Sequence, residues 1–67
     1  MKHPIPTWTL KDVERWRRMS SCVGRLINYT FTASERQQAI DKLQTLYPAR
    51  RVYPAFAERI LYLSELY

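Results

Sequence analysis

The chain contains a single glycine among its 67 residues. Glycine supplies the left-handed backbone conformations that tight turns and two-residue β-hairpins require. A sequence with almost no glycine therefore favours helices joined by ordinary loops. Hydrophobic residues make up 46% of the chain and charged residues 25%, which is typical of a folded protein. We predict an all-α fold, a small three-helix bundle with helices over residues 9–28, 32–47 and 54–66.

Two capping boxes predict where the first two helices begin. Thr9 precedes Asp12 by three residues, and Thr32 precedes Glu35 by the same spacing. In such a box the side chain of each residue accepts a hydrogen bond from the free main-chain N–H of the other. The box satisfies amides that the first turn of a helix leaves without partners. We therefore expect each threonine to stand immediately before its helix.

Prolines indicate the remaining boundaries. Pro54 suits the first turn of the third helix, where its missing N–H costs nothing. The segment 48–54 is bounded by two prolines and is predicted to be a loop. Residues 1–8 also contain two prolines and are predicted to form a short irregular arm. We see no internal repeat or linker, so the chain is expected to form one helical domain over residues 1–67.

Apolar residues recur at the spacing of a helix face and predict the core. The first helix contributes a broad apolar face that includes both Val13 and Trp16. The full predicted set is Val13, Trp16, Met19, Ser20, Val23, Leu26 and Ile27 in the first helix, Ala39, Ile40, Leu43, Leu46 and Tyr47 in the second, and Phe56, Ile60, Leu63 and Tyr67 in the third.

The third predicted helix is apolar nearly all round. Leu61, Tyr62 and Leu66 fall outside its main apolar face. A helix of this kind is buried on more than one side, and two other short helices are not expected to cover it fully. A 67-residue chain is also close to the lower limit for a self-sufficient core. We therefore predict that these three residues contact another chain, most simply in a homodimer.

Positive charge predicts an anionic partner. The formal net charge is +5, and residues 1–29 carry six basic and two acidic side chains, a net charge of +4. The excess follows one face of the first predicted helix and continues in the loop before the third helix. The candidate electrostatic contact residues are Lys11, Arg15, Arg18, Arg25, Arg50 and Arg51.

Catalysis, metal binding and cofactor binding are not expected. His3 is the only histidine and Cys22 the only cysteine, so they cannot supply the four ligands of a structural zinc site. We find no paired carboxylate motif and no glycine-rich phosphate loop. Cys22 lies near Arg18 and Arg25, whose positive charges favour the thiolate form of its side chain. Apart from His3 in the N-terminal arm, the sequence contains no imidazole to activate this thiol. We interpret Cys22 as a small, half-buried filler.

A protein partner is the leading hypothesis and a nucleic acid the alternative. Trp, Tyr and Arg dominate the energetics of protein interfaces, and they make up fifteen of the 67 residues. A regulator or inhibitor that binds an acidic protein surface is therefore predicted. The alternative is phosphate binding through the basic face of the first helix. The long, proline-bounded connection 48–54 argues against a helix-turn-helix, which needs a tight turn.

The expected location is the cytoplasm. The segment 1–10 lacks the apolar core of a signal peptide, and no stretch approaches the length of a membrane span. The first predicted helix is basic and amphipathic, as membrane-surface helices are, but its apolar face is needed for the core. The single cysteine suits a reducing compartment.

Overall fold

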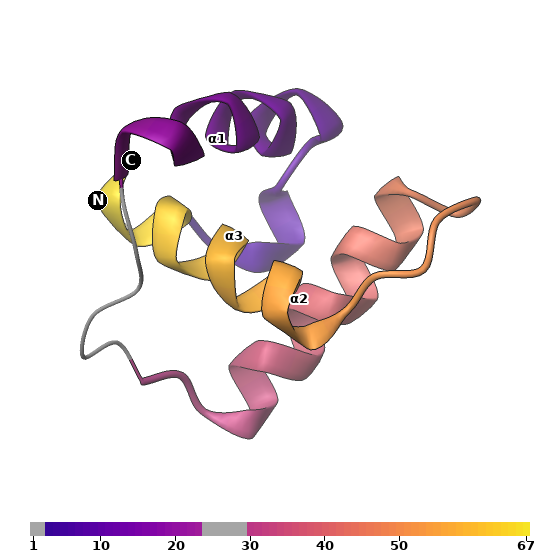
Figure 1. Ribbon diagram of the computed structural model, residues 1–67. Coiled ribbons are helices and arrows are strands. Elements are labelled where there is room, and N and C mark those ends of the chain that lie inside the picture. The colour runs from indigo at the N-terminus through magenta and orange to yellow at the C-terminus, as the bar shows by residue number, and fades with distance from the viewer. Residues whose placement is uncertain (1–2, 24–29) are drawn as a thin grey trace.

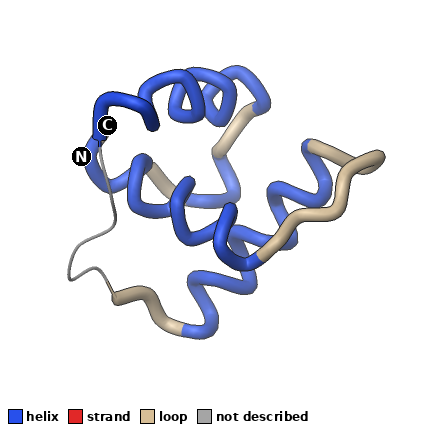
Figure 2. The backbone as a smooth tube through the Cα atoms, viewed as in Figure 1, coloured by secondary structure: helices blue, strands red, loops and turns tan. Residues whose placement is uncertain are grey.

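A computed structural model of the protein describes residues 3–23 and 30–67, and within them it contains helices and loops only (Figures 1 and 2). The all-α prediction is confirmed, with three α-helices packed together. Both α1 and α2 contact α3, which lies between them in Figure 1. Residues 24–28 of the predicted first helix lie outside the described part. The elements are a short 3-10 helix η1 (Ile5–Thr7), α1 (Leu10–Val23), α2 (Ala33–Leu46) and α3 (Pro54–Leu66).

Both capping boxes form as predicted. The Thr9 N–H donates to Asp12 Oδ2 at 3.2 Å, and the Asp12 N–H donates to Thr9 Oγ1 at 3.2 Å. At α2, the Thr32 N–H donates to Glu35 Oε1 and the Glu35 N–H donates to Thr32 Oγ1, both at 3.0 Å. Pro54 occupies the first turn of α3. The local signals in the sequence therefore place the start of every α-helix correctly.

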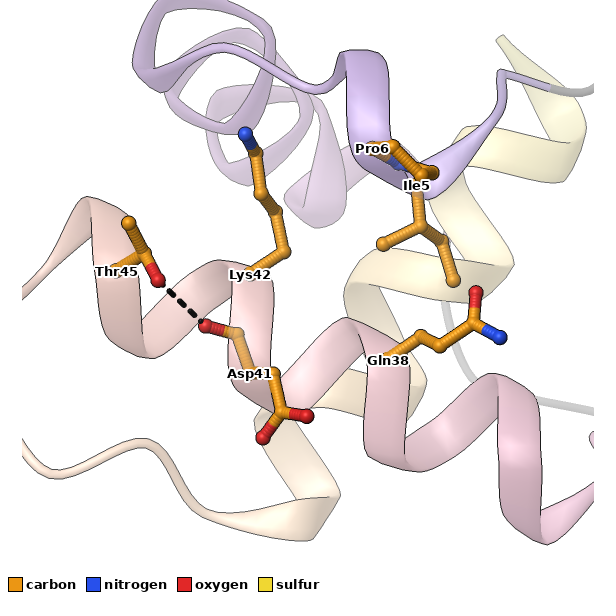
Figure 3. A pocket seen from close by; sticks show the side chains of 6 residues that line it. All are labelled: Ile5, Pro6, Gln38, Asp41, Lys42 and Thr45. Atoms are coloured by element: carbon orange, nitrogen blue, oxygen red, sulfur yellow. Dashed lines mark hydrogen bonds between the residues drawn. The ribbon is translucent and has the colours of Figure 1, made fainter.

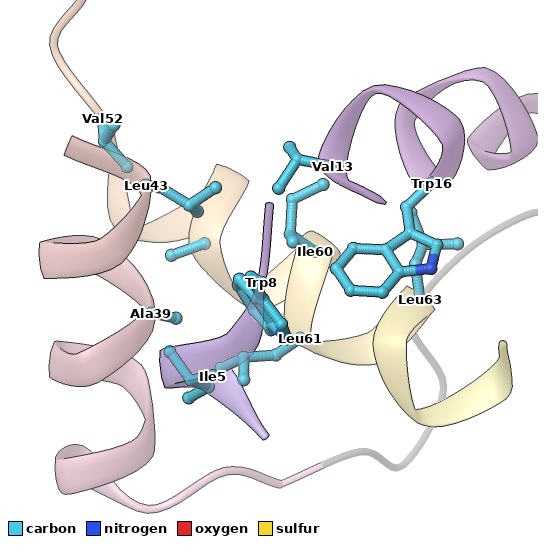
Figure 4. Close-up of a cluster of buried hydrophobic side chains, with 11 residues drawn as sticks. Ile5, Trp8, Val13, Trp16, Ala39, Leu43, Val52, Ile60, Leu61 and Leu63 are labelled. Atoms are coloured by element: carbon cyan, nitrogen blue, oxygen red, sulfur yellow. The ribbon is translucent and has the colours of Figure 1, made fainter. Parts of the chain in front are cut away.

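The core is built around α3, which is buried on several sides. Its residues Ala57, Ile60, Leu61 and Leu63 are buried, and the buried Ser64 donates its hydroxyl hydrogen to the Leu61 carbonyl oxygen at 2.7 Å. Figure 4 shows how side chains from all the helical elements meet there. The remaining members of this buried cluster are Ile5, Trp8, Val13, Trp16, Ala39, Leu43 and Val52.

The N-terminal segment is more ordered than predicted. Instead of an irregular arm throughout, Ile5–Thr7 form η1, which packs against α2. Ile5 is buried, and Trp8 is only 1% exposed. The Trp8 indole N–H donates to the His3 carbonyl oxygen at 3.2 Å. The prolines exclude an α-helix here, as expected, but they do not prevent two large apolar side chains from entering the core.

This segment also explains why α3 is covered without a partner chain. The prediction assumed that only two helices were present to shield it. Ile5 and Trp8 belong to the same buried cluster as Leu61, as Figure 4 shows. Leu61 is 1% exposed. The expectation that Leu61 contacts another chain is therefore wrong, because residues before α1 supply the missing cover.

The two ends of the described chain meet. His3 Nε2 lies 2.8 Å from the main-chain oxygen of Tyr67, within hydrogen-bonding distance. The His3 ring also packs against the indole of Trp16, with ring centroids 5.5 Å apart. Both ends lie on one side of the molecule in Figure 1, and the α2–α3 loop lies on the other. None of the described helices has both the length and the apolar character that a membrane crossing requires.

Candidate binding site

A pocket of about 250 Å³ lies at the loop between α2 and α3. Arg50, Arg51 and Tyr53 line it from the loop, and Phe56 lines it from the first turn of α3. The two arginines are exposed, and Tyr53 is 60% exposed. Phe56 is half-buried and packs against the core. The site therefore combines positive charge with an apolar, aromatic wall.

Gln44 on α2 holds this loop in place with its side chain. Its amide NH₂ group donates to the carbonyl oxygens of Tyr47 at 3.0 Å and Arg50 at 2.7 Å. Its carbonyl oxygen accepts from the Val52 N–H at 3.1 Å. The Arg50 N–H also donates to the Tyr47 carbonyl oxygen at 3.2 Å, and the Val52 side chain is buried. The loop backbone is thus ordered before any ligand arrives, which lowers the entropy cost of binding.

The arginines of the pocket keep their charge available. The Arg51 guanidinium carbon lies 5.5 Å from the centre of the Tyr53 ring, a cation–π contact. Within residues 3–23 and 30–67, no carboxylate forms an ion pair with Arg50 or Arg51. An arginine can receive a carboxylate through two parallel hydrogen bonds. The pocket therefore offers two such groups beside aromatic rings.

Tyr47 connects this pocket to α1. Its ring packs edge to face on Phe56, with centroids 6.5 Å apart, and its hydroxyl donates to Glu14 Oε1 at 3.1 Å. Arg17 lies 4.0 Å from the same Glu14 carboxylate. Burial raises the pKa of Tyr47, Arg17 lowers it, and the hydrogen bond to Glu14 raises it further, with a net increase. Arg17 of α1 thus lies near Tyr47, paired with Glu14, although the sequence prediction did not include it.

The predicted basic residues divide into two groups. Arg50 and Arg51 line the pocket. Lys11, Arg15 and Arg18 are exposed on α1 and do not line it. The Arg15 guanidinium lies 4.0 Å from Asp12, at the start of the same helix. Arg25 lies outside the described residues, and so does the side chain of Cys22.

The three residues predicted to make apolar contacts differ in how far they are exposed. Leu61 belongs to the core, as described above. Tyr62 is half-buried and packs against the core, whereas Leu66 is 45% exposed. Of the three residues, Leu66 offers the most apolar surface to a partner.

Several polar side chains of α2 form contacts within the molecule. Gln37 donates to Asp41 Oδ1 at 2.9 Å, and Gln38 donates to Ser34 Oγ at 3.3 Å. Arg36 Nε lies 2.7 Å from Glu58 Oε1, an ion pair between α2 and α3 without a well-aligned hydrogen bond. Both glutamines remain exposed, and each uses one N–H in these contacts.

A second pocket of about 340 Å³ lies between η1 and α2 (Figure 3). Its polar lining carries both signs of charge, from Asp41 and Lys42. The Thr45 hydroxyl donates to the Asp41 carbonyl oxygen at 3.0 Å, a bond within α2. Its remaining lining residues are Ile5, Pro6 and Gln38. This pocket lacks the single-signed charge of the loop site, so it indicates no particular ligand.

The described residues contain no group of three or more His, Cys, Asp and Glu side chains that could hold a metal ion. The loop pocket, with its two exposed arginines and its aromatic wall, is the strongest candidate site. No family model matches the chain, and comparisons with curated proteins and with solved structures gave no match.

Proposed function

We propose that this chain is a non-enzymatic binding protein that attaches to an acidic surface of another protein and thereby regulates or inhibits it. The loop pocket, formed by Arg50, Arg51, Tyr53 and Phe56, is the proposed contact site. The observation that supports this function most directly is the pair of arginines without carboxylate partners among the described residues. Their backbone is held by Gln44.

The chemistry of the pocket suits a protein partner. Arginine and tyrosine are enriched among the few residues that carry most of the energy of protein interfaces. A carboxylate of the partner replaces water on each guanidinium and pairs with it bidentately. The exposed Lys11, Arg15 and Arg18 on α1 add long-range attraction. Such charges speed association more than they strengthen the final complex.

Nucleic acid is the competing partner, and the test separates the two. A nucleic-acid binder tracks the phosphate backbone with several cations, and its affinity falls steeply with salt. For such a binder, the charges on α1 and those in the loop contribute equally to the affinity. A protein bound in the pocket depends more strongly on the loop arginines than on those of α1.

Affinity capture from a lysate of the source cells, with and without nuclease treatment, tests this proposal. The bait is the full chain at a physiological ionic strength of about 0.15 M. One variant combines Arg50→Gln with Arg51→Gln, and the matched control combines Lys11→Gln with Arg15→Gln. Both remove two positive charges from exposed positions. Mass spectrometry identifies the retained proteins, and each is then purified and bound directly.

We expect a protein that remains bound after nuclease treatment, is lost with the loop variant and is retained by the control. Retention of nucleic acid by the purified chain at this ionic strength, weakened equally by both variants, contradicts the proposal. An equal loss of the protein partner with both variants also contradicts the assignment of the site to the loop.

We further propose that the protein acts in the cytoplasm as a homodimer. Leu66 at the end of α3 is exposed and the predicted contact residue Tyr62 is half-buried, and the exposed Tyr67 adds apolar surface beside them. Light scattering at high micromolar concentration should give the mass of two chains, and Leu66→Ala should lower it. A monomeric mass at that concentration contradicts the proposed homodimer and leaves the proposal for the loop site unchanged.

A further inference from the structure

We infer that the loop pocket receives one apolar side chain, an aromatic ring, from an acidic segment of the partner. The carboxylates next to that ring pair with Arg50 and Arg51. This inference rests on the proposed function and specifies the chemistry of the segment that is recognised. It predicts that negative charge alone is not sufficient for tight binding.

The volume of the pocket matches one side chain. A cavity of about 150 Å³ is large enough to hold benzene, whereas pockets for whole small molecules span roughly 300–1,000 Å³. At about 250 Å³ the loop pocket lies between these sizes. It therefore has room for one ring together with its connecting methylene.

The walls of the pocket favour an aromatic ring. Tyr53 and Phe56 supply two of its four lining side chains. Aromatic rings attract one another edge to face or offset, beyond the effect of burying their area. Phe56 is already held by Tyr47 at 6.5 Å between ring centroids, so this wall is fixed in place. Filling the pocket removes the apolar surface of both the ring and the wall from water.

The rim of the pocket favours acidic neighbours of that ring. Arg50 and Arg51 are consecutive and both line the pocket. The Arg51 guanidinium is placed by its contact with the Tyr53 ring. The main chain enters α3 directly beyond these residues, and the side chain of Tyr53 does not cap the helix. The positive end of the α3 dipole thus adds to the same charge.

Fluorescence anisotropy with labelled probes tests the inference on the full chain. The first probe is a blocked peptide of sequence Asp-Glu-Phe-Glu-Asp. The second replaces its Phe by Ala, and the third replaces its acidic residues by Lys. Polyglutamate reports on charge alone, and a single-stranded oligonucleotide reports on nucleic-acid binding.

We expect the Phe peptide to bind about tenfold or more tightly than the Ala peptide, since one anchor residue often carries this much affinity. The Lys peptide should not bind. Tyr53→Ala should abolish the preference for Phe, and Tyr53→Phe should restore it. Tyr53 is exposed, so circular dichroism should show the same helix content in both variants.

The outcomes separate the two proposals. Equal affinity for the Phe and Ala peptides, with polyglutamate bound as well, overturns the aromatic anchor and leaves the acidic partner standing. Binding of the oligonucleotide in preference to every acidic probe overturns the proposed function. Failure of every acidic probe to bind overturns both.

Discussion

The indole rings of Trp8 and Trp16 meet edge to face, with centroids 5.2 Å apart and an interplanar angle of 74°. This contact joins the segment before α1 to the inner face of α1 itself. Such aromatic pairs contribute roughly 0.5–1.5 kcal/mol beyond the burial of their area. Both side chains are almost fully buried. The N-terminal segment is therefore part of the core of this protein.

Trp8→Ala should strongly destabilise the fold. Removing a buried tryptophan side chain costs about 3–5 kcal/mol, which is comparable to the whole free energy of unfolding of a small domain. Thermal unfolding followed by circular dichroism measures the change. Leu10→Ala is the control, because Leu10 is 44% exposed, and its effect should stay within about 0.5 kcal/mol. Equal melting temperatures for the two variants contradict the burial of Trp8.

Leu61→Ala and Leu66→Ala should differ in their effect on stability. Leu61 is buried in the cluster around α3, and Leu66 is exposed near its end. Truncating a buried leucine costs about 2–5 kcal/mol, and an exposed one about 0.5 kcal/mol or less. Urea unfolding measures both free energies. If Leu66→Ala proves the more damaging at low protein concentration, the assignment of the two residues is wrong.

Gln44→Leu should loosen the α2–α3 loop. The substitution keeps the approximate size of the side chain but removes all three hydrogen bonds to the loop backbone. We expect a loss of about 1–3 kcal/mol, because polar groups are left without partners. Amide hydrogen exchange at Val52 should become faster. Gln38→Leu is the matched control, because among the described residues the Gln38 side chain bonds only to Ser34 of the same helix, and it should leave Val52 unchanged.

Alkaline pH should destabilise the protein partly through Tyr47. Its pKa is raised in the folded state, chiefly by burial, so the folded chain holds this proton more tightly than the unfolded chain. The stabilisation is present below about pH 10, the ordinary pKa of tyrosine, and is lost as pH rises through the folded pKa. Tyr47→Phe should remove this part of the loss of stability at alkaline pH. Chemical unfolding between about pH 9 and 11 measures it.

Tyr53→Phe is the control for that series, because Tyr53 is exposed on the loop. Parallel curves for the wild type and Tyr47→Phe contradict the role assigned to the Tyr47 hydroxyl.

Local signals made most of the helical architecture predictable. The Thr9–Asp12 and Thr32–Glu35 boxes depend on residues three apart, so sequence spacing alone reveals them. The position of Pro54 follows from the same kind of local rule. The burial of Trp8 does not follow from a local rule. It depends on a segment without α-helical periodicity that folds back onto distant helices, and the two prolines of that segment led to the prediction of an irregular arm. The error at Leu61 follows directly, because its cover comes from that segment.

The candidate site was predictable only in part. Arg50 and Arg51 stand out as charge in a proline-bounded loop, and they do line the pocket. Phe56 was expected on the core face of α3, and it is only half-buried. The role of Gln44 depends on the path of the loop backbone, which cannot be predicted from the pattern of residue types. The predicted basic residues Lys11, Arg15 and Arg18 of α1 do not line the pocket, because residue types alone do not show which helix face lies beside a loop.

The contact between His3 and Tyr67 has a practical consequence for attachment. Whatever is joined to either end of the described chain, whether an affinity tag, a solid support or a neighbouring polypeptide, departs from the same pole of the molecule. The opposite pole, where the α2–α3 loop lies, then remains facing outward. Tethering through either terminus should therefore leave the loop arginines accessible, so immobilised protein can be used without masking them.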